Sequence, residues 1–307
     1  MRDAFIKSLL EEIKTDSSII LLTADLGFGV FEELETKHPN QYINVGVAEQ
    51  NMVGVATGLS MEGFRTLTYS IGNFPTLRCL EQIRNDACYH EINLTIVGMG
   101  GGFSYGPLGM SHHATEDLAI MRSLPNMKVV APGTEEEAFF AIKELIKSTG
   151  VSYLRLDKKF AKPNKILKRE FKLGKSIKYR EGNDISIFST GGILDEVLKA
   201  ADNLEKKGIK TRVYNFHTIK PLDGDSIKKA VLETNGIITI EEHNLIGGLS
   251  SAVCEYCMKE KLYPNIFKSI GLNDEYSSIV GNQDYLRSQY KINANEICSI
   301  VNKFFNK

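Results

Sequence analysis

The stretch KVVAPGTEEEAFFAIKELIKSTGVSYLRL, residues 128–156, decides the fold class because it reads as a strand, a helix and a second strand. The short apolar runs at its two ends are typical of strands that are buried on both faces of a sheet. Between them, apolar residues recur at helical spacing over about 135–147, with Thr134 as a candidate N-cap and Glu137 in the capping-box position. A unit of this kind predicts a parallel sheet with helices packed on its faces.

The same alternation extends in both directions from this stretch. Continuous apolar runs at 19–22 and 94–97 predict two earlier strands of the same sheet. The pattern then restarts, with predicted strands at 185–189, 212–216 and 237–240 that are separated by turns and helices. We therefore expect an α/β protein with two consecutive doubly wound domains.

A basic segment separates the two units. Residues 158–184 contain ten Lys and Arg against three Asp and Glu. Because charge runs of this kind are usually solvated, we interpret the segment as a connector, with an anion-binding arm as the alternative. The predicted boundaries are a first domain at 1–160, a linker at 161–183 and a second domain at 184–307.

The composition of the 307 residues excludes several functional classes. Hydrophobic residues make up 42% and charged residues 24%, and the net charge of −1 provides no general attraction to nucleic acid or to an anionic membrane. No run of 18 apolar residues predicts a membrane-spanning helix. Five cysteines, an odd number, do not predict a disulfide framework, so we expect a reducing, cytoplasmic location. Cys254 and Cys257 are interpreted as buried structural residues of a helix, with a redox or zinc pair as the alternative.

Ligands of open α/β sheets bind at the carboxyl ends of the strands, so the loops that follow the predicted strands are the candidate site. One such loop leads to Glu49, which begins a helix rich in small residues. Its carboxyl group would be poorly solvated there and could bind a nitrogen of a ligand, or it could simply interact with the helix dipole. A second loop contains His112 and His113, which point to different sides in an extended segment and so make a poor pair of metal ligands. One of them is a candidate for proton transfer or hydrogen bonding.

Several motifs resemble the transketolase family. Residues 23–27, Thr-Ala-Asp-Leu-Gly, and 44–52, Asn-Val-Gly-Val-Ala-Glu-Gln-Asn-Met, resemble its pyrimidine-binding domain. Residues 109–113, Gly-Met-Ser-His-His, resemble its substrate-facing histidine loop. The second unit, with Lys-Pro-Leu-Asp at 220–223 and Glu-Glu-His at 241–243, is similar to the family's C-terminal domain.

This resemblance implies a thiamine-diphosphate-dependent transferase that moves a two-carbon ketol unit from a ketose to an aldose. It implies that Glu49 and His112 are the catalytic residues. It further implies that thiamine diphosphate is bound by Asp25, Leu26, Glu49 and Phe74. The substrate would be bound by His112 and, at its phosphate, by Arg78 and Lys158. The Leu108 position carries an Asp in family members, so the donor substrate is left open.

The resemblance also implies that part of the enzyme lies on another chain. The Gly-Asp-Gly motif that binds the diphosphate through Mg²⁺ in full-length members has no counterpart here, because the only Gly-Asp is followed by Ser226. We therefore expect the C-terminal subunit of a split transketolase, with no metal ligands of its own. Its partner would be an N-terminal subunit that holds Mg²⁺ and the diphosphate, in an α2β2 assembly.

Two other functions remain open from the sequence. One is a related enzyme, either the β subunit of a 2-oxo acid dehydrogenase or decarboxylase, or an acyl transferase similar to 1-deoxyxylulose-5-phosphate synthase. The other is a non-catalytic regulatory subunit, against which the retention of Glu49 and His112 argues.

Overall fold

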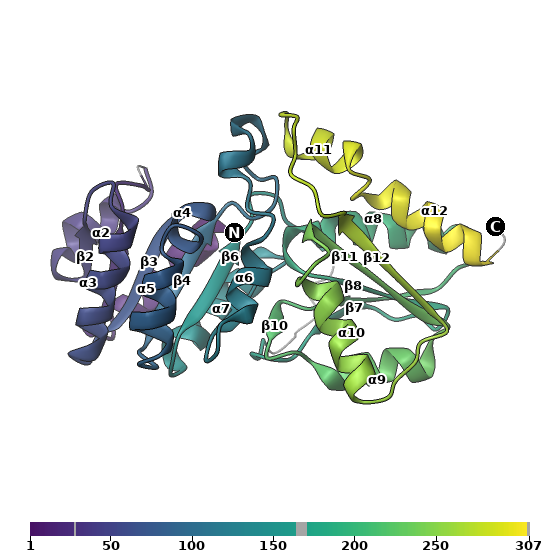
Figure 1. Cartoon of the computed structure of the whole chain (residues 1–307), viewed down its shortest axis with the longest axis horizontal. Helices are drawn as coiled ribbons and strands as arrows, with labels where there is room; N and C mark the ends of the chain where they lie inside the picture. The colour runs from purple at the N-terminus through teal and green to yellow at the C-terminus, as the bar shows by residue number, and fades with distance from the viewer. Residues whose placement is uncertain (28, 164–170, 306–307) are drawn as a thin grey trace.

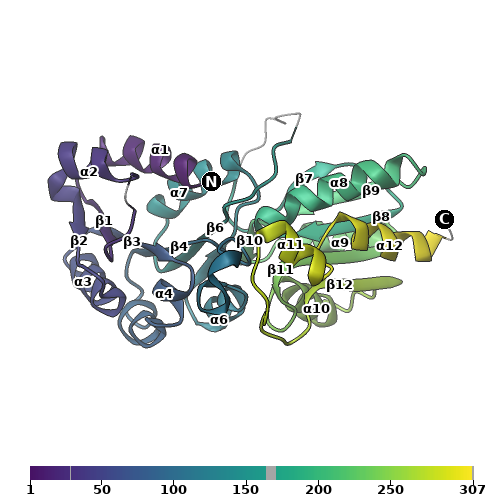
Figure 2. The same cartoon turned by 90° about the horizontal axis from the view of Figure 1, so that it is seen from above.

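The computed structural model describes residues 1–27, 29–163 and 171–305, which form two α/β domains lying side by side (Figure 1). Viewed from above, helices cover both faces of the sheet in each domain (Figure 2). This arrangement confirms the predicted fold class of two consecutive doubly wound units. Within the described ranges, none of the helices has both the length and the apolar character that a bilayer span requires.

The first sheet contains seven of the described strands, in the order β10-β5-β6-β4-β3-β1-β2. Its strands are β1 (Ile19–Thr23), β2 (Tyr42–Asn44), β3 (Arg65–Ile71), β4 (Leu94–Met99), β5 (Lys128–Val130), β6 (Ser152–Leu156) and β10 (Thr218–Lys220). All neighbours pair in parallel except β10, which runs antiparallel to β5. Every residue of β1, β4 and β6 is buried, as expected for strands covered on both faces.

An apolar core on each face of this sheet holds the helices of the first domain. One face carries α1 (Arg2–Ile13), α2 (Glu32–Lys37) and α7 (Glu135–Lys147). The other face carries α3 (Glu49–Met61), η2 (Ile83–Cys88) and α6 (Asp117–Ser123). Short helical turns complete the domain: η1 (Pro39–Gln41), α4 (Asn73–Thr76), α5 (Leu80–Gln82), η3 (Gly106–Leu108) and η4 (Met110–His112).

The strand–helix–strand unit that decided the fold class forms as predicted, with one difference at its cap. The Thr134 hydroxyl caps α7 by accepting a hydrogen bond from the backbone N–H of Glu137, at 3.1 Å. The Glu137 carboxylate does not close a capping box on Thr134. It accepts instead from the backbone N–H of Gly133 and from Nδ2 of Asn215, both at 2.6 Å. The start of α7 is thereby bonded to the second domain.

The second sheet is built from five of the described strands in the order β12-β11-β8-β9-β7. Its strands are β7 (Ile177–Arg180), β8 (Ile185–Ser189), β9 (Thr211–Asn215), β11 (Gly236–Asn244) and β12 (Ile266–Leu272). β7 is antiparallel to β9, and the other neighbours are parallel. The helical segments are η5 (Gly191–Ile193), α8 (Leu194–Glu205), α9 (Gly224–Glu233), α10 (Leu249–Lys259), α11 (Gln283–Gln289) and α12 (Ala294–Phe305).

The structure adds strands that the sequence pattern did not predict: β2, β3, β7, β10 and β12. In β3 the buried positions include the hydroxyl residues Thr66, Thr68 and Ser70. Because these residues are polar, a hydrophobicity pattern does not reveal the strand. β7 lies inside the range 161–183 that was predicted as a linker, so the C-terminal part of that range belongs to the second sheet. Residues 164–170 of the predicted linker lie outside the described residues.

A buried cluster of charges joins the two domains at the end of β6. Arg155 is 2% exposed, and its guanidinium donates to Asp157 at 3.1 Å and to Asp117 at 3.3 Å. Its Nη2 donates to the carbonyl oxygen of Glu242 in the second domain, at 3.0 Å. Asp157 in turn accepts from the backbone N–H of Gly192, ahead of α8, at 2.6 Å. Because these charges are excluded from water, each depends on its partner inside the protein.

We predict that Arg155→Met lowers the free energy of unfolding by about 3–5 kcal/mol, because it leaves buried carboxylates without a cation. Urea denaturation of the two proteins measures the difference. The matched control is Arg180→Met, since Arg180 pairs with the solvent-exposed Asp202 and Glu205. That change should cost about 1 kcal/mol or less. Equal losses in the two variants would contradict the structural role of the cluster.

Glu241 is a second buried charge near the junction. It has no exposed surface, and it accepts hydrogen bonds from the backbone N–H groups of Leu249 at 2.7 Å and Ser250 at 2.8 Å, at the start of α10. His243 lies 3.8 Å from the same carboxylate. Burial raises the pKa of Glu241 to about 7, and burial also lowers the pKa of His243.

This raised pKa predicts a pH-dependent contribution to stability. Between pH 4.5 and about 7 the folded protein holds a proton on Glu241 that the unfolded chain releases. The contribution of Glu241 to the free energy of unfolding therefore falls as the pH rises through this window, by an amount on the order of 3 kcal/mol. We expect Glu241→Gln to remove this decline in unfolding curves measured across the window. Glu260→Gln, an exposed change after the end of the same helix, should leave the wild-type profile intact.

Candidate active site

The predicted site residues lie in loops and at helical segments that follow the carboxyl ends of the strands of the first sheet. Asp25 and Leu26 follow β1, and Glu49 begins α3 after β2. Phe74 and Arg78 follow β3. The remaining two are His112, which follows β4, and Lys158, which follows β6. A parallel sheet brings these loops together at one edge even though they are far apart in the sequence.

Glu49 is a buried carboxylate at this edge of the sheet. It is the first residue of α3 and its side chain is 3% exposed, which matches the poorly solvated position that the sequence predicted. Its Oε2 atom lies 2.6 Å from Nη1 of Arg78. The helix N-terminus and the guanidinium both stabilise a negative charge at this position.

A row of side chains leads from Glu49 to Lys158. The guanidinium carbon of Arg78 lies 4.9 Å from the centre of the Phe74 ring, and the Phe74 and His112 rings are 5.3 Å apart. The His112 and Tyr105 rings are 6.4 Å apart, and the Lys158 ammonium lies 3.5 Å from the centre of the Tyr105 ring. The structure therefore brings together Glu49, Arg78, Phe74, His112 and Lys158.

The two adjacent histidines have different environments. His112 is half-buried, faces Phe74 and Tyr105, and shares a 3.0 Å hydrogen bond between its Nδ1 and the Ser111 hydroxyl. His113 is buried against Phe103, and its Nε2 is 3.2 Å from the carbonyl oxygen of Gly106. Burial lowers the pKa of His113. The predicted divergence of the pair is confirmed, and only His112 belongs to the row.

Asn73 fixes the spacing between the Phe74 segment and the histidine loop. Its Nδ2 donates to the carbonyl oxygen of His113, and the carbonyl oxygen of Ser111 lies 3.4 Å from the same atom. Cys79 donates through its thiol to the carbonyl oxygen of Phe74 at 3.4 Å. These backbone contacts hold the Phe74 ring beside His112.

Asp25 lies on the loop after β1, which is bonded to the loop that leads to Glu49. Its backbone N–H donates to Oδ1 of Asn44 at 2.9 Å, and its carboxylate accepts from Nδ2 of Asn44 at 3.2 Å. Asn44 Oδ1 also accepts from the backbone N–H of Gly46, at 3.0 Å. One amide thus ties the loop after β1 to the loop that precedes α3.

A cavity of about 520 Å³ opens at the Lys158 end of the row. Leu26, Tyr105 and Lys158 line it, together with Asp157 of the buried charge cluster. Burial lowers the pKa of Lys158, with a further contribution from the neighbouring charge of Arg2. Arg2 also lines the cavity, and so do Asp3, which pairs with Arg2, and Glu135.

Tyr105, Asn44 and Arg2 were not predicted as site residues. Arg2 belongs to the first helix, and only the tertiary fold brings it next to Lys158. Tyr105 lies three residues after the glycines at 100–102 that follow β4, and its aromatic character was the available signal. Asn44 stands inside the motif that contains Glu49, which could have identified it.

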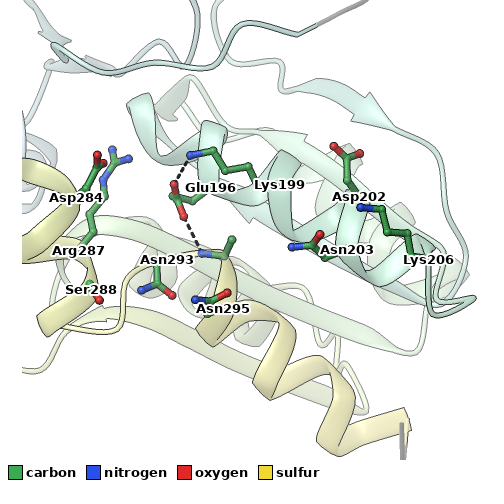
Figure 3. A pocket seen from close by; sticks show the side chains of 11 residues that line it. Glu196, Lys199, Asp202, Asn203, Lys206, Asp284, Arg287, Ser288, Asn293 and Asn295 are labelled. Atoms are coloured by element: carbon green, nitrogen blue, oxygen red, sulfur yellow. Dashed lines mark hydrogen bonds and ion pairs between the residues drawn. The ribbon is translucent and has the colours of Figure 1, made fainter.

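Figure 3 shows a second cavity, of about 570 Å³, on the second domain between α8 and the start of α12. Its acidic groups are already paired: Glu196 lies 2.6 Å from Lys199, and its other oxygen accepts from the backbone N–H of Ala294 at 2.9 Å. Asp202 pairs with Arg180, and Asp284 pairs with Lys159. None of the candidate site residues lines this second cavity.

Two further sequence-based interpretations can be compared with the structure. Within the described ranges, no three or more His, Cys, Asp or Glu side chains come together as a group that could hold a metal ion. All five cysteines are free thiols. Cys257 is buried as predicted, but Cys254 is exposed because it lies on the outer side of α10. The interpretation of both as buried residues was therefore wrong for Cys254.

Comparisons with known proteins agree with this geometry. Residues 1–163 match the family model for the transketolase pyrimidine-binding domain, and residues 174–297 match the model for the transketolase C-terminal domain. The 6-deoxy-6-sulfo-D-fructose transketolase subunit SqwH of Clostridium sp. strain MSTE9 is 34% identical over 298 residues, which are 97% of this chain and 92% of that protein. An apulose-4-phosphate transketolase subunit of Phocaeicola vulgatus is 32% identical over 309 residues, which are 100% of this chain and 97% of that protein.

A solved structure of a split transketolase is similar to this chain over nearly its whole length. A split-gene transketolase, described as an inactive β4 tetramer, superposes with a TM-score of 0.87 at 32% identity. The match covers 98% of this chain and 96% of that one.

Proposed function

The chain belongs to the transketolase family, and we propose that it is the C-terminal subunit of a split transketolase that works with an N-terminal partner. The reaction transfers a two-carbon ketol unit from a ketose to an aldose. One carbon–carbon bond of the ketose breaks, and a new one forms at the carbonyl carbon of the aldose. The relatives named as transketolase subunits support the division of the enzyme between two chains.

The observation that carries this proposal is the buried Glu49 carboxylate beside the aromatic ring of the Phe74 segment, with Arg78 in contact with both. A pyrimidine ring needs a hydrogen-bonding group for a ring nitrogen and a flat apolar surface for its face, and Glu49 and Phe74 offer these two features. The residues present therefore fit the pyrimidine half of thiamine diphosphate. When bound, this cofactor supplies a nucleophilic carbon of its thiazolium ring.

The chain's own residues take distinct parts in the proposed mechanism. Glu49 binds the aminopyrimidine ring, Phe74 packs against its face, and Asp25 and Leu26 complete the cofactor site from the loop after β1. His112, half-buried at the centre of the row, donates to or accepts from a substrate oxygen. The sequence resemblance assigns the diphosphate and its Mg²⁺ to the partner subunit, in an α2β2 complex.

The free thiols of all five cysteines support a reducing, cytoplasmic location.

The proposal on the substrate class rests on Lys158. Lys158 and Arg2 line a cavity at the carboxyl ends of the strands, together with the carboxylates of Asp3, Glu135 and Asp157. Asp3 pairs with Arg2 and Asp157 pairs with Arg155, which leaves Lys158 as the group suited to the phosphate of a sugar phosphate. We propose Lys158 as a substrate-binding residue on this ground.

A second activity is favoured by one observation. Leu108, at the position where the family carries an Asp, is 55% exposed at the end of η3 beside the histidine loop. An apolar side chain cannot bind a donor hydroxyl, so an acyl donor is the alternative to a ketose. The 1-deoxy-D-xylulose-5-phosphate synthase 1 of Geobacter sulfurreducens is 31% identical over 97% of this chain, although the match covers 47% of that protein. Product analysis with ketose and 2-oxo acid donors separates the two activities.

We expect Glu49→Gln to lower kcat by about 100-fold or more in the co-expressed complex supplied with thiamine diphosphate and Mg²⁺. His112→Asn should lower kcat/KM by about 10- to 100-fold, since it removes a hydrogen bond made during the reaction. A coupled assay of transfer between ketose and aldose substrates measures both changes. Glu62→Gln, after the end of α3, is the matched control for Glu49. Full activity in Glu49→Gln would rule out the proposed mechanism.

Lys158→Gln should raise the KM for a phosphorylated substrate by about 10- to 100-fold, the value of one charge-assisted hydrogen bond. The KM for the corresponding unphosphorylated sugar should change little, because it lacks the anion. Lys162→Gln, an exposed lysine four residues further on, is the control. An equal rise in KM for both sugars would show that Lys158 does not recognise the phosphate.

A further inference from the structure

Arg78 was expected from the sequence resemblance to hold a substrate phosphate, but its contacts in the structure are with other groups. Its Nη1 atom lies 2.6 Å from the Glu49 carboxylate, which is 3% exposed, and its guanidinium stacks 4.9 Å from the centre of the Phe74 ring. We propose that Arg78 is a positioning residue that orients the Glu49 carboxylate toward the cofactor, and that it is not a ligand for the substrate phosphate. This inference rests on the proposed function, because it assigns Glu49 to the pyrimidine ring.

The burial of Glu49 is the first argument. A carboxylate that is removed from water needs a cation or hydrogen-bond donors in the protein, and removal of its partner is costly. Arg78 provides a cation for Glu49 at ion-pair distance. If Arg78 turned to a phosphate, Glu49 would lose this partner while remaining buried.

The restraint on Arg78 is the second argument. Although 48% of the Arg78 side chain is exposed, its guanidinium is restrained on two sides, by the Phe74 ring and by the Glu49 carboxylate. Phe74 is itself held by the Cys79 thiol and by the neighbouring Asn73, which is bonded to the histidine loop. The direction of the Glu49 carboxylate is therefore set by a chain of contacts that includes the histidine loop.

The place of the anion site is the third argument. The cavity proposed for the phosphate, which Lys158 lines together with Arg2 and three carboxylates, lies at the opposite end of the row from Arg78. Arg78 does not line this cavity. The two cations predicted to bind substrate therefore have different roles, with Lys158 facing the substrate and Arg78 facing Glu49.

A double-mutant cycle on the chain alone tests the contact without any cofactor. Arg78→Gln should lower the urea midpoint of unfolding, and the additional change Glu49→Gln should recover part of this loss, because no buried charge is then left unpaired. Arg84→Gln is the matched control, since Arg84 is an exposed arginine six residues further on that donates to the adjacent Asn85. This control should leave the midpoint unchanged. Additive shifts for Arg78 and Glu49 would overturn the proposal.

The complex with the partner subunit tests the positioning role. Arg78→Gln should weaken thiamine diphosphate binding, measured by calorimetry, by about 10-fold or more, and Arg78→Lys should recover part of it. The KM for a phosphorylated substrate should stay within about twofold of wild type. A raised KM with unchanged cofactor affinity would overturn the proposal and make Arg78 a phosphate ligand. If the wild-type complex binds no thiamine diphosphate, the proposed function fails. The double-mutant cycle, which needs no cofactor, then still shows whether Arg78 and Glu49 interact.

Discussion

The two-domain arrangement depends on a guanidinium group that has almost no access to solvent. Arg155, at the end of β6, is surrounded by Asp117 and Asp157 of its own domain and by the carbonyl oxygen of Glu242 from the other. Asp157 also bonds the backbone ahead of α8 and lines the cavity beside Lys158. A single buried network therefore sets both the orientation of the second domain and one wall of the candidate site. A buried charge of this kind tolerates few geometries, so it specifies one packing of the domains.

The topology of the first sheet brings the candidate site residues together. The burial of each side chain determines which parts of the site are polar. Segments that follow five parallel strands meet at one edge, where the Glu49 carboxylate is buried and Lys158 lines the cavity. Phe74, His112 and Tyr105 fill the space between the two charges. The three rings are only partly buried, and they separate the charged groups at the two ends of the row, which are placed to bind different polar parts of a ligand. The second domain takes part indirectly, through the buried charges that position the end of β6.

The sequence predicted what depends on local pattern and missed what depends on tertiary contact. The unit at 128–156 was predictable because strand and helix periods change at its Thr134 cap. Glu49, Phe74 and His112 were named as candidates because motifs mark them, and the structure places Phe74 beside His112 and, through Arg78, next to Glu49. β3 was hidden by its buried hydroxyl residues, and β10 pairs with a strand of the other domain, which no local pattern encodes. The contact between Arg78 and Glu49 joins two loops, so neither loop alone could reveal it.

The pairing of β10 with β5 has a consequence for how the domains can be divided. Residues 218–220 belong to the second half of the sequence but form the edge of the first sheet. A cut between the two matched families, near residue 170, would leave β5 with an unpaired edge, and such edges promote association with other chains. The two domains are thus separate as sequence families, but they share a sheet. The first domain therefore depends on the second for its edge strand, so the two halves are not interchangeable modules.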